Sequence, residues 1–295
     1  MPSSQLPQRP SHAIRCGFFR TIPLLSLLVS GSALAGCAAH AQAGDAAPHS
    51  PGPPRIEVDL SSHFRALGAD GAFVLYDAAG DRLLVYNPER ARRGFLPAST
   101  FKILNSLIAL ETGVISDERE VIPWDGVDWG DWWNGDMDMS KAFQRSAVWF
   151  YREVARRIGE RRMGEWVERA AYGNRDIGGG EDRFWLSGGL RISPEEQVEF
   201  LRRLHRGDLP FSERSQAIVR RIMWMEEGEG YLLRGKTGWA VSDGVDYGWL
   251  VGWVEKEGRP YFFATQIESA ARAFPMRRAQ QEITRGALRD LGILP

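Results

Sequence analysis

A serine and a lysine stand three positions apart, at Ser99 and Lys102, where an apolar segment begins that runs to residue 110. The segment contains no glycine or proline, and its apolar residues recur at helical spacing, which predicts a mostly buried helix. Residues three apart share a helix face, so we expect the Lys102 amine beside the Ser99 hydroxyl. Burial disfavours the charged form of lysine, so such an amine can activate a serine nucleophile. Because a helix start with a chance lysine gives the same pattern, the pair needs supporting residues.

Two other segments carry groups that could work with this pair. The stretch 235–239 follows an expected strand. Within it, Lys236 offers positive charge, Thr237 a hydroxyl, and Gly238 a backbone that a ligand can approach without meeting a Cβ atom. Ser146 begins the sequence Ser-Ala-Val and could pass protons between a base and a leaving group. The sequence therefore predicts a site that combines two serines with two lysines.

Other common catalytic and binding machinery is missing from residue 55 onward. The two histidines there, His63 and His205, lie far apart on helix-like segments, which disfavours a Ser-His-Asp triad or a multi-histidine zinc site. No phosphate-binding glycine motif stands between a strand and a helix, which disfavours nucleotide cofactors. The 37 basic and 38 acidic residues nearly cancel, so no overall field favours nucleic acid. We expect neither a metal nor a nucleic-acid partner.

The first 36 residues are predicted to be a signal peptide. Arg15 and Arg20 precede an apolar run at 21–30, which is too short to span a bilayer stably but is typical of a secretory signal. We therefore expect the protein to be exported to the periplasm.

The sequence Leu34-Ala35-Gly36-Cys37 is similar to a bacterial lipobox. We expect cleavage before Cys37 and lipidation of that cysteine, which would anchor the protein to the outer membrane as a lipoprotein. Cleavage by ordinary signal peptidase after Ala41 or Ala43 is the alternative. The other cysteine, Cys16, lies inside the signal, so the folded part has no disulfide.

Composition divides the chain into the signal peptide (1–36), a Pro/Ala-rich tether (37–54) and a catalytic domain (55–295). In the domain, strand patterns occur at both ends and helical patterns between them. The expected strands are 71–77, 82–87, 231–234, 247–254 and 261–266, the helices lie mainly between 99 and 225, and a last helix covers about 275–291. This order predicts an α+β fold, with one antiparallel sheet built from both termini and a central helical lobe.

In order and separation, the three motifs resemble those of the penicillin-recognising serine enzymes. Within that superfamily the sequence is similar to the class D β-lactamases, the oxacillinases, over roughly residues 57–292. Class A enzymes would have Ser-Asp-Asn at the central motif, where this chain has Ser146-Ala147-Val148. Further matching pieces are Tyr172-Gly173-Asn174, Phe184-Trp185-Leu186 and Val251-Gly252-Trp253-Val254. The resemblance implies the fold shared by serine β-lactamases and penicillin-binding transpeptidases.

The resemblance also implies a reaction, the hydrolysis of small-molecule β-lactams through an acyl-enzyme on Ser99. The backbone N–H groups of Ser99 and Trp239 would hold the developing oxyanion. Lys102 would be carboxylated by CO2 and would act as the general base in both steps, while Ser146 would relay a proton toward the lactam nitrogen. No cofactor other than this CO2 is implied.

A lysine carbamate requires a neutral amine in a dry pocket. The resemblance assigns that role to Phe101, Val148 and Trp185, with the Trp185 indole N–H donating to the carbamate.

Recognition of the substrate carboxylate falls to the Lys-Thr-Gly motif and to an arginine before the last helix. The resemblance implies Lys236, Thr237 and Gly238 on the strand and Arg277 near the helix. Because Arg272 and Arg278 are close in sequence and carry the same fork of donors, the choice among the three arginines stays open.

The stretch from Trp124 to Met139, with Trp129, Trp132 and Trp133, permits two interpretations. It could form a rim for bulky substrate side chains, or its aromatic rings could pack in the core. Two rival functions stay open as well. One is a β-lactam-sensing or DD-peptidase domain that is acylated without efficient turnover, and the other is a catalytically inactive lipoprotein with a binding role.

Overall fold

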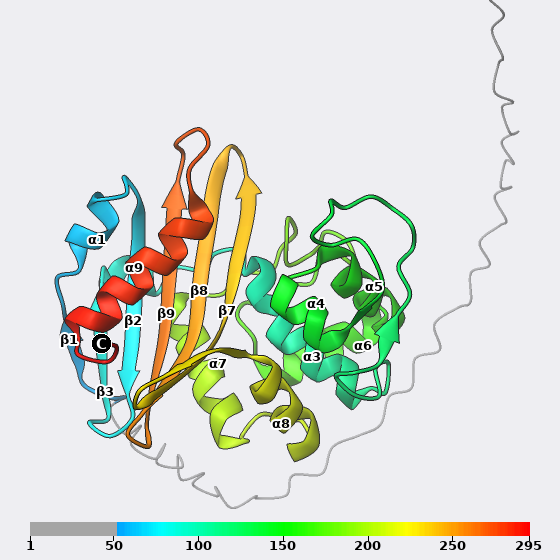
Figure 1. Cartoon of the computed structure of the whole chain (residues 1–295), viewed down its shortest axis with the longest axis horizontal. Helices are drawn as coiled ribbons and strands as arrows, with labels where there is room; N and C mark the ends of the chain where they lie inside the picture. The colour runs from blue at the N-terminus through cyan, green and yellow to red at the C-terminus, as the bar shows by residue number, and fades with distance from the viewer. Residues whose placement is uncertain (1–51) are drawn as a thin grey trace, which may run out of the picture. The chain divides into compact units, whose positions relative to one another are not determined.

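A seven-stranded sheet, with helices on both faces and a helical lobe beside it, makes up residues 52–295, the part of the chain that the computed structural model describes (Figure 1). The predicted signal peptide (1–36), the predicted lipidation site at Cys37 and nearly all of the predicted tether (37–54) lie outside the described residues. Those assignments therefore remain predictions.

The sheet joins strands from both ends of the domain. In spatial order its strands are β1 (Arg55–Glu57), β3 (Arg82–Tyr86), β2 (Asp70–Asp77), β9 (Arg259–Ser269), β8 (Val245–Lys256), β7 (Tyr231–Ser242) and β6 (Trp224–Gly228). All neighbours run antiparallel except β1 and β3, which are parallel. The N-terminal strand β2 pairs directly with the C-terminal strand β9. The predicted α+β fold is confirmed, with the parallel β1–β3 pair as a difference from the expected antiparallel sheet.

The helices fall into three groups around this sheet (Figure 1). On one face lie α1 (Ser61–Arg65) and α9 (Met276–Asp290), and on the other α7 (Pro194–Arg206). Beside β7 stands the helical lobe, with the 3-10 turn η1 (Ala98–Phe101) and the helices α3 (Lys102–Glu111), α4 (Met139–Arg145), α5 (Val148–Ile158), α6 (Glu160–Ala170) and α8 (Glu213–Ile222). The short helix α2 (Pro88–Ala91) and the two-strand pair β4 (Val121–Ile122) and β5 (Met137–Asp138) complete the described elements.

Alternate residues of β2 enter two separate cores. Phe73 and Leu75 pack with residues of α1 and α9, whereas Val74 and Tyr76 pack in the core that α7 and the helical lobe share. Successive side chains of a strand point to opposite faces, and here both faces are covered. This explains why 72–76 is apolar throughout and shows no alternation.

Strand β7 is longer than the sequence predicts, because it continues from Tyr231 through the Lys-Thr-Gly motif to Ser242. The strand pattern in the sequence predicts an end at residue 234, directly before the stretch that contains Gly235 and Gly238. In the structure both glycines pair with β8, opposite Gly252 and Trp249. The motif therefore lies within a strand and does not follow one.

None of the helices within residues 52–295 is long and apolar enough to cross a membrane.

We expect Gly252→Ala to destabilise the sheet where β7 and β8 approach each other. A Cβ atom at Gly252 would lie 2.0 Å from the carbonyl oxygen of Arg234 and 2.7 Å from the Cα atom of Gly235. The backbone shift needed to admit this atom should lower the free energy of unfolding by about 1–3 kcal/mol, which urea denaturation can measure. Gly52→Ala is the control, because a Cβ atom there meets nothing within 4 Å. Equal stability of the two variants would contradict this account.

Candidate active site

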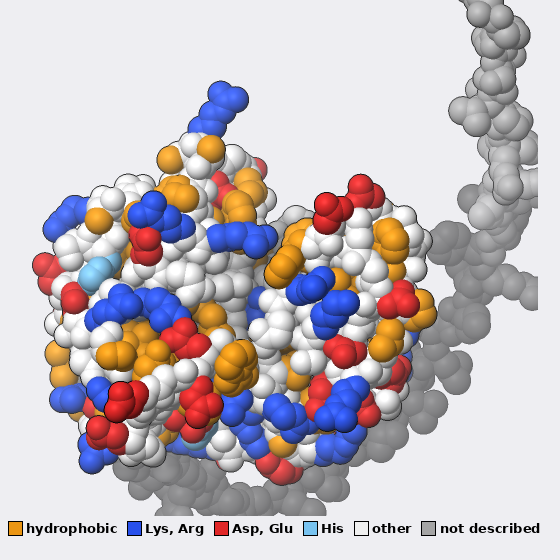
Figure 2. Space-filling model, viewed as in Figure 1, with side chains coloured by type: hydrophobic (Ala, Val, Ile, Leu, Met, Phe, Trp, Pro, Cys, Tyr) orange, Lys and Arg blue, Asp and Glu red, His pale blue; other side chains and the backbone are white. Residues whose placement is uncertain are grey.

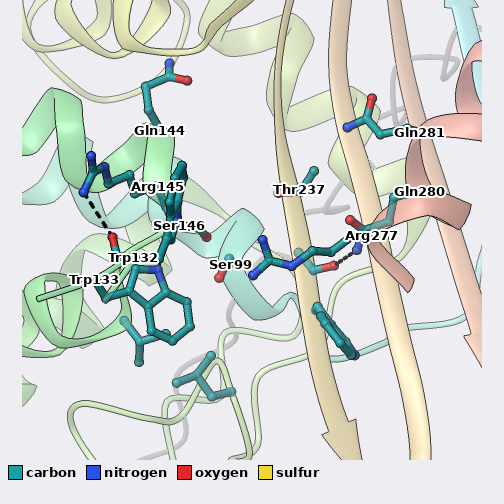
Figure 3. Close-up of a pocket in the computed structure, with 14 residues that line it drawn as sticks. Ser99, Trp132, Trp133, Gln144, Arg145, Ser146, Thr237, Arg277, Gln280 and Gln281 are labelled. Carbon is teal, nitrogen blue, oxygen red and sulfur yellow. Dashed lines mark hydrogen bonds between the residues drawn. The ribbon is translucent and has the colours of Figure 1, made fainter. Parts of the chain in front are cut away.

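A cleft of about 380 Å³ opens between β7 and the helical lobe (Figures 2 and 3). Four separate parts of the chain contribute residues to its walls. Ser99 comes from η1, Ser146 from the junction of α4 and α5, Thr237 from β7 and Arg277 from α9. The fold thus brings together the motifs that the sequence singled out.

Ser99 and Lys102 are in direct contact, because Lys102 Nζ donates to Ser99 Oγ at 2.7 Å. The predicted helix begins as a 3-10 turn over Ala98–Phe101, and only then continues as α3. In a 3-10 turn the side chains at i and i+3 are eclipsed, which brings this pair closer than an α-helix start would. The predicted proximity is confirmed, and the tighter turn accounts for it.

Lys102 is completely buried, and within the described residues no carboxylate forms an ion pair with it. Burial is the main cause that holds the pKa of Lys102 well below its ordinary value, and the nearby positive charge of Lys236 lowers it further. A lowered pKa favours the neutral amine, and a neutral amine can accept a proton from Ser99.

The Tyr151 ring lies beside this lysine, with its centroid 5.3 Å from Lys102 Nζ, and aromatic Phe101 directly precedes it in the chain. Phe101 stacks on Trp185 with ring centroids 5.3 Å apart, and Val148 lines the neighbouring cleft. Within the described structure Trp185 Nε1 is buried and has no hydrogen-bond partner. A buried donor without an acceptor is costly and uncommon, so this N–H is suited to an oxygen-bearing group in the pocket.

Ser146 occupies a strained backbone position at the end of α4, with φ 56° and ψ 36° in the left-handed region. That conformation costs a non-glycine residue about 1–3 kcal/mol, so the surrounding packing must hold it. Its hydroxyl oxygen accepts from Lys236 Nζ at 2.9 Å. The two residues therefore form a second serine–lysine pair in the cleft.

Lys236 is nearly as enclosed as Lys102, with 4% of its surface exposed. Burial lowers its pKa to about 7, and the positive charge of Arg277 contributes. Its ammonium group also donates to the backbone oxygen of Thr237 at 2.9 Å.

The arginine in the cleft is Arg277. Figure 3 shows its side chain extending from α9 toward Ser99. Arg278 turns away and pairs with Glu282 at 2.7 Å, and Arg272 does not line the cleft. Among the three arginines that the sequence left open, Arg277 is the one that lines the cleft.

Gly238 lets β7 run closely along η1. A Cβ atom on Gly238 would lie 3.0 Å from the carbonyl oxygen of Pro97 and 3.1 Å from Thr100 Cγ2. A Cβ atom at these distances would be crowded, and η1 would have to shift by a few tenths of an ångström to admit it. The peptide that links Gly238 to Trp239 therefore lies beside the turn that carries Ser99.

In the described residues no group of three or more His, Cys, Asp or Glu side chains could hold a metal ion.

Comparison with known proteins identifies the family. Residues 71–289 match the family described as "Penicillin binding protein transpeptidase domain". The chain is 42% identical over 237 residues to beta-lactamase OXA-48 of Klebsiella pneumoniae, covering 80% of this chain and 88% of that protein. The solved structure of class D beta-lactamase YbXI from Nostoc superposes with a TM-score of 0.77 and 46% identity, covering 80% of this chain and 100% of that one. The chain belongs to the class D β-lactamase family.

The same fold serves a receptor as well. The C-terminal domain of the Bacillus licheniformis BlaR penicillin-receptor superposes on this class D β-lactamase with a TM-score of 0.79 and 33% identity, covering 83% of this chain and 100% of that one. The fold alone therefore does not distinguish a hydrolase from a sensor, and the chemistry of the site must decide between them.

The tryptophans of the stretch 124–139 divide between the wall of the cleft and the core. Trp132, which is 57% exposed, and Trp133 line the cleft of this class D β-lactamase. Trp124 and Trp129 pack against the core of the helical lobe, as Trp133 does in part. The stretch thus forms a rim of the cleft, and its own tryptophans hold this rim against the core.

Arg145 fastens that rim, a role that sequence reasoning missed. Its backbone oxygen accepts from the indole N–H groups of Trp132, at 3.3 Å, and Trp133, at 2.9 Å. Its guanidinium group lies over the Trp132 ring, 4.8 Å from the centroid, and donates to the Trp132 carbonyl. The only sequence signal for this role is the position of Arg145 directly before Ser146.

The proton affinities of the two buried lysines can be measured directly, since lysine occurs only at positions 102, 141, 236 and 256. In CO2-free buffer, carbon-13 NMR of the lysine ε-carbons should show Lys102 titrating well below the ordinary lysine range and Lys236 with a midpoint near pH 7. Lys236→Met should raise the pKa of Lys102, because it removes a neighbouring positive charge. Titration of both lysines near their reference value of about 10.4 would contradict this account.

Proposed function

We propose that this class D β-lactamase hydrolyses β-lactam antibiotics in two steps, through an acyl-enzyme on Ser99. The observation that carries the proposal is the 2.7 Å contact between Ser99 Oγ and the buried amine of Lys102, whose pKa is lowered. The substrate class is supported by the relatives, which are named β-lactamases.

Acylation begins with proton transfer from Ser99 to Lys102, while Ser99 Oγ attacks the lactam carbonyl carbon. Negative charge then develops on the carbonyl oxygen. The backbone N–H groups of Ser99 and Trp239 are the proposed donors to that oxygen, since the close packing of β7 on η1 brings both peptides to one side of the cleft. A pair of fixed donors in a site that excludes water stabilises the tetrahedral intermediate.

The second serine–lysine pair serves the leaving group. When the ring opens, the lactam nitrogen needs a proton, and Ser146 can pass one to it while taking another from Lys236. A pKa of about 7 lets Lys236 release and regain that proton near neutral pH. The strained backbone of Ser146 holds its hydroxyl in place for this transfer.

Binding of the substrate carboxylate is proposed for the opposite wall of the cleft. Arg277 offers a planar fork of N–H donors, and Thr237 adds a hydroxyl from the adjacent strand. Gly238 also lines this wall, and Lys236 contributes positive charge when it is protonated.

The residues around Lys102 are suited to a carbamate. CO2 adds only to a neutral amine, forming the N–C bond and releasing one proton. The resulting carbamate would then replace the free amine as the general base in acylation and would also activate the deacylating water. The lowered pKa of Lys102 provides the neutral amine, and the unpartnered Trp185 N–H provides a donor for a carbamate oxygen. Phe101 and Val148 keep water away from it.

A β-lactam sensor or a DD-peptidase is the second candidate function, favoured by the likeness to the BlaR receptor domain. Both alternatives also acylate a serine, but neither hydrolyses the antibiotic acyl group efficiently. Steady turnover of a chromogenic cephalosporin by purified protein supports the lactamase, whereas a burst of one equivalent followed by no turnover supports a sensor or a DD-peptidase.

Ser99→Ala should abolish turnover and acylation, because it removes only the attacking hydroxyl. Mass spectrometry after incubation with benzylpenicillin should show an adduct on the wild type and none on the variant. Ser187→Ala, at an exposed position outside the cleft, is the control and should keep full activity. A penicilloyl adduct on Ser99→Ala would refute the assignment of the nucleophile.

Trp185→Phe should slow deacylation more than acylation, because it keeps an aromatic ring but removes the buried N–H donor. The acyl-enzyme should then accumulate, and added bicarbonate should restore part of the turnover by mass action on the carbamate. Lys102→Ala should not respond to bicarbonate. If wild-type protein supplied with labelled bicarbonate shows no carbamate carbon by NMR, Lys102 works as a plain amine.

We further propose that the protein is exported to the periplasm and anchored to the outer membrane through lipidated Cys37. Cys37→Ser should move it from the detergent fraction to the soluble periplasmic fraction, because the acyl chains supply the membrane affinity. Equal soluble distribution of both forms would favour cleavage after Ala41 or Ala43.

A further inference from the structure

Gln280, on α9, makes a hydrogen bond that the proposed reaction has not used. Its side chain is buried, with 2% of its surface exposed, and its Nε2 atom donates to the carbonyl oxygen of Gly238 at 2.6 Å. Figure 3 shows this bond reaching from α9 to β7, next to the Arg277 side chain. The acceptor belongs to the Lys-Thr-Gly motif, where backbone position matters for catalysis.

The carbonyl of Gly238 and the N–H of Trp239 belong to one peptide group. No peptide bond in residues 52–295 is cis, so the two groups point to opposite sides of that peptide plane. The Gln280 amide, which donates to the Gly238 carbonyl, and the proposed oxyanion, which would accept from the Trp239 N–H, therefore lie on opposite sides of this peptide and form one chain of hydrogen bonds. Hydrogen bonds in such a chain polarise one another, so the bond from Gln280 makes the Trp239 N–H a stronger donor.

We propose that Gln280 is a positioning residue of the oxyanion hole, which orients and polarises the Gly238–Trp239 peptide from behind. The inference rests on the proposed function, in which the Trp239 N–H holds the oxyanion. Gln280 touches neither the substrate carbonyl nor Ser99 in this role, and acts through the peptide alone.

The placement of Gln280 on α9 links two tasks of the site. Arg277 lies three residues earlier on the same helix, so both side chains leave α9 toward the cleft one turn apart. The helix is held against the sheet by buried Met276, whose sulfur occupies the space that a Cβ atom on Gly248 would need. One rigid helix thus sets the distance between the proposed carboxylate anchor and the proposed oxyanion donor.

Gln280→Met tests the proposal, because it keeps the length of the side chain and removes its donor. We expect kcat for benzylpenicillin to fall about tenfold with KM little changed, a smaller loss than the roughly 10²–10³-fold effect of deleting an oxyanion donor. A boronic acid, which forms a tetrahedral adduct with the serine, should bind about tenfold more weakly. The carbonyl stretch of the acyl-enzyme should shift to higher wavenumber, because the carbonyl is less polarised.

Gln216→Met is the matched control. Gln216 is equally buried and also donates to backbone carbonyls, of which Phe211 is the nearest at 2.8 Å, but it does not line the cleft. This variant should lose stability without any change in the carbonyl frequency or in boronate affinity. If Gln280→Met does not fold, Gln280→Asn replaces it, since its shorter amide falls short of the Gly238 carbonyl and the same shifts are expected.

The possible outcomes separate the inference from the function on which it rests. A wild-type enzyme that is acylated and binds the boronate, with unchanged kcat and carbonyl frequency in the Gln280 variants, overturns the inference alone. Loss of stability in those variants without a spectroscopic shift overturns it too, because a merely structural role gives that result. A wild-type protein that is not acylated at Ser99 overturns the proposed function and the inference together.

Discussion

The burial of an amine without a carboxylate partner is the constraint on which the site depends. A lysine in an apolar core normally loses its charge or gains a partner, and Lys102 has only Ser99 as a hydrogen-bond partner in the described structure. The Tyr151 ring lies 5.3 Å from its amine, and Phe101, the residue before it, lies in one aromatic cluster with Tyr172, Phe184 and Trp185. The core of the helical lobe thus supports folding and also lowers the pKa of Lys102, the proposed base.

A second constraint is the close contact between β7 and η1. The glycine at 238 allows the strand to approach the turn that carries Ser99, and Gln280 holds the same peptide from the other side. The strand is long and paired along its length with β8, so it is a rigid edge for the cleft. The proposed catalytic groups on β7 and on η1, which are far apart in the sequence, therefore lie on two rigid elements that contact each other.

Sequence reasoning could predict what short-range spacing determines. The three-residue interval of Ser99 and Lys102, the apolar run of α3 and the order of the motifs were sufficient for the site's centre and for the fold class. It could not predict the extension of β7, because the cost of its glycines is local and the pairing that offsets it is long-range. Arg145 and Gln280 were missed for a similar reason, since each acts on a backbone carbonyl or ring that only the fold brings near.

The two buried lysines also tie this catalytic chemistry to the stability of the whole domain. In the unfolded chain each lysine would hold its proton up to about pH 10.4, whereas in the folded protein Lys236 releases it at about pH 7 and the pKa of Lys102 also lies well below its ordinary value. Between these values the unfolded state binds more protons, so the contribution of this pair to stability improves as the pH rises from about 7 toward 10 and is most unfavourable at low pH. Acidification should therefore lower both the proposed catalytic activity and the stability of the fold. The reason is that protonation of these buried amines removes the neutral base and also favours the unfolded state.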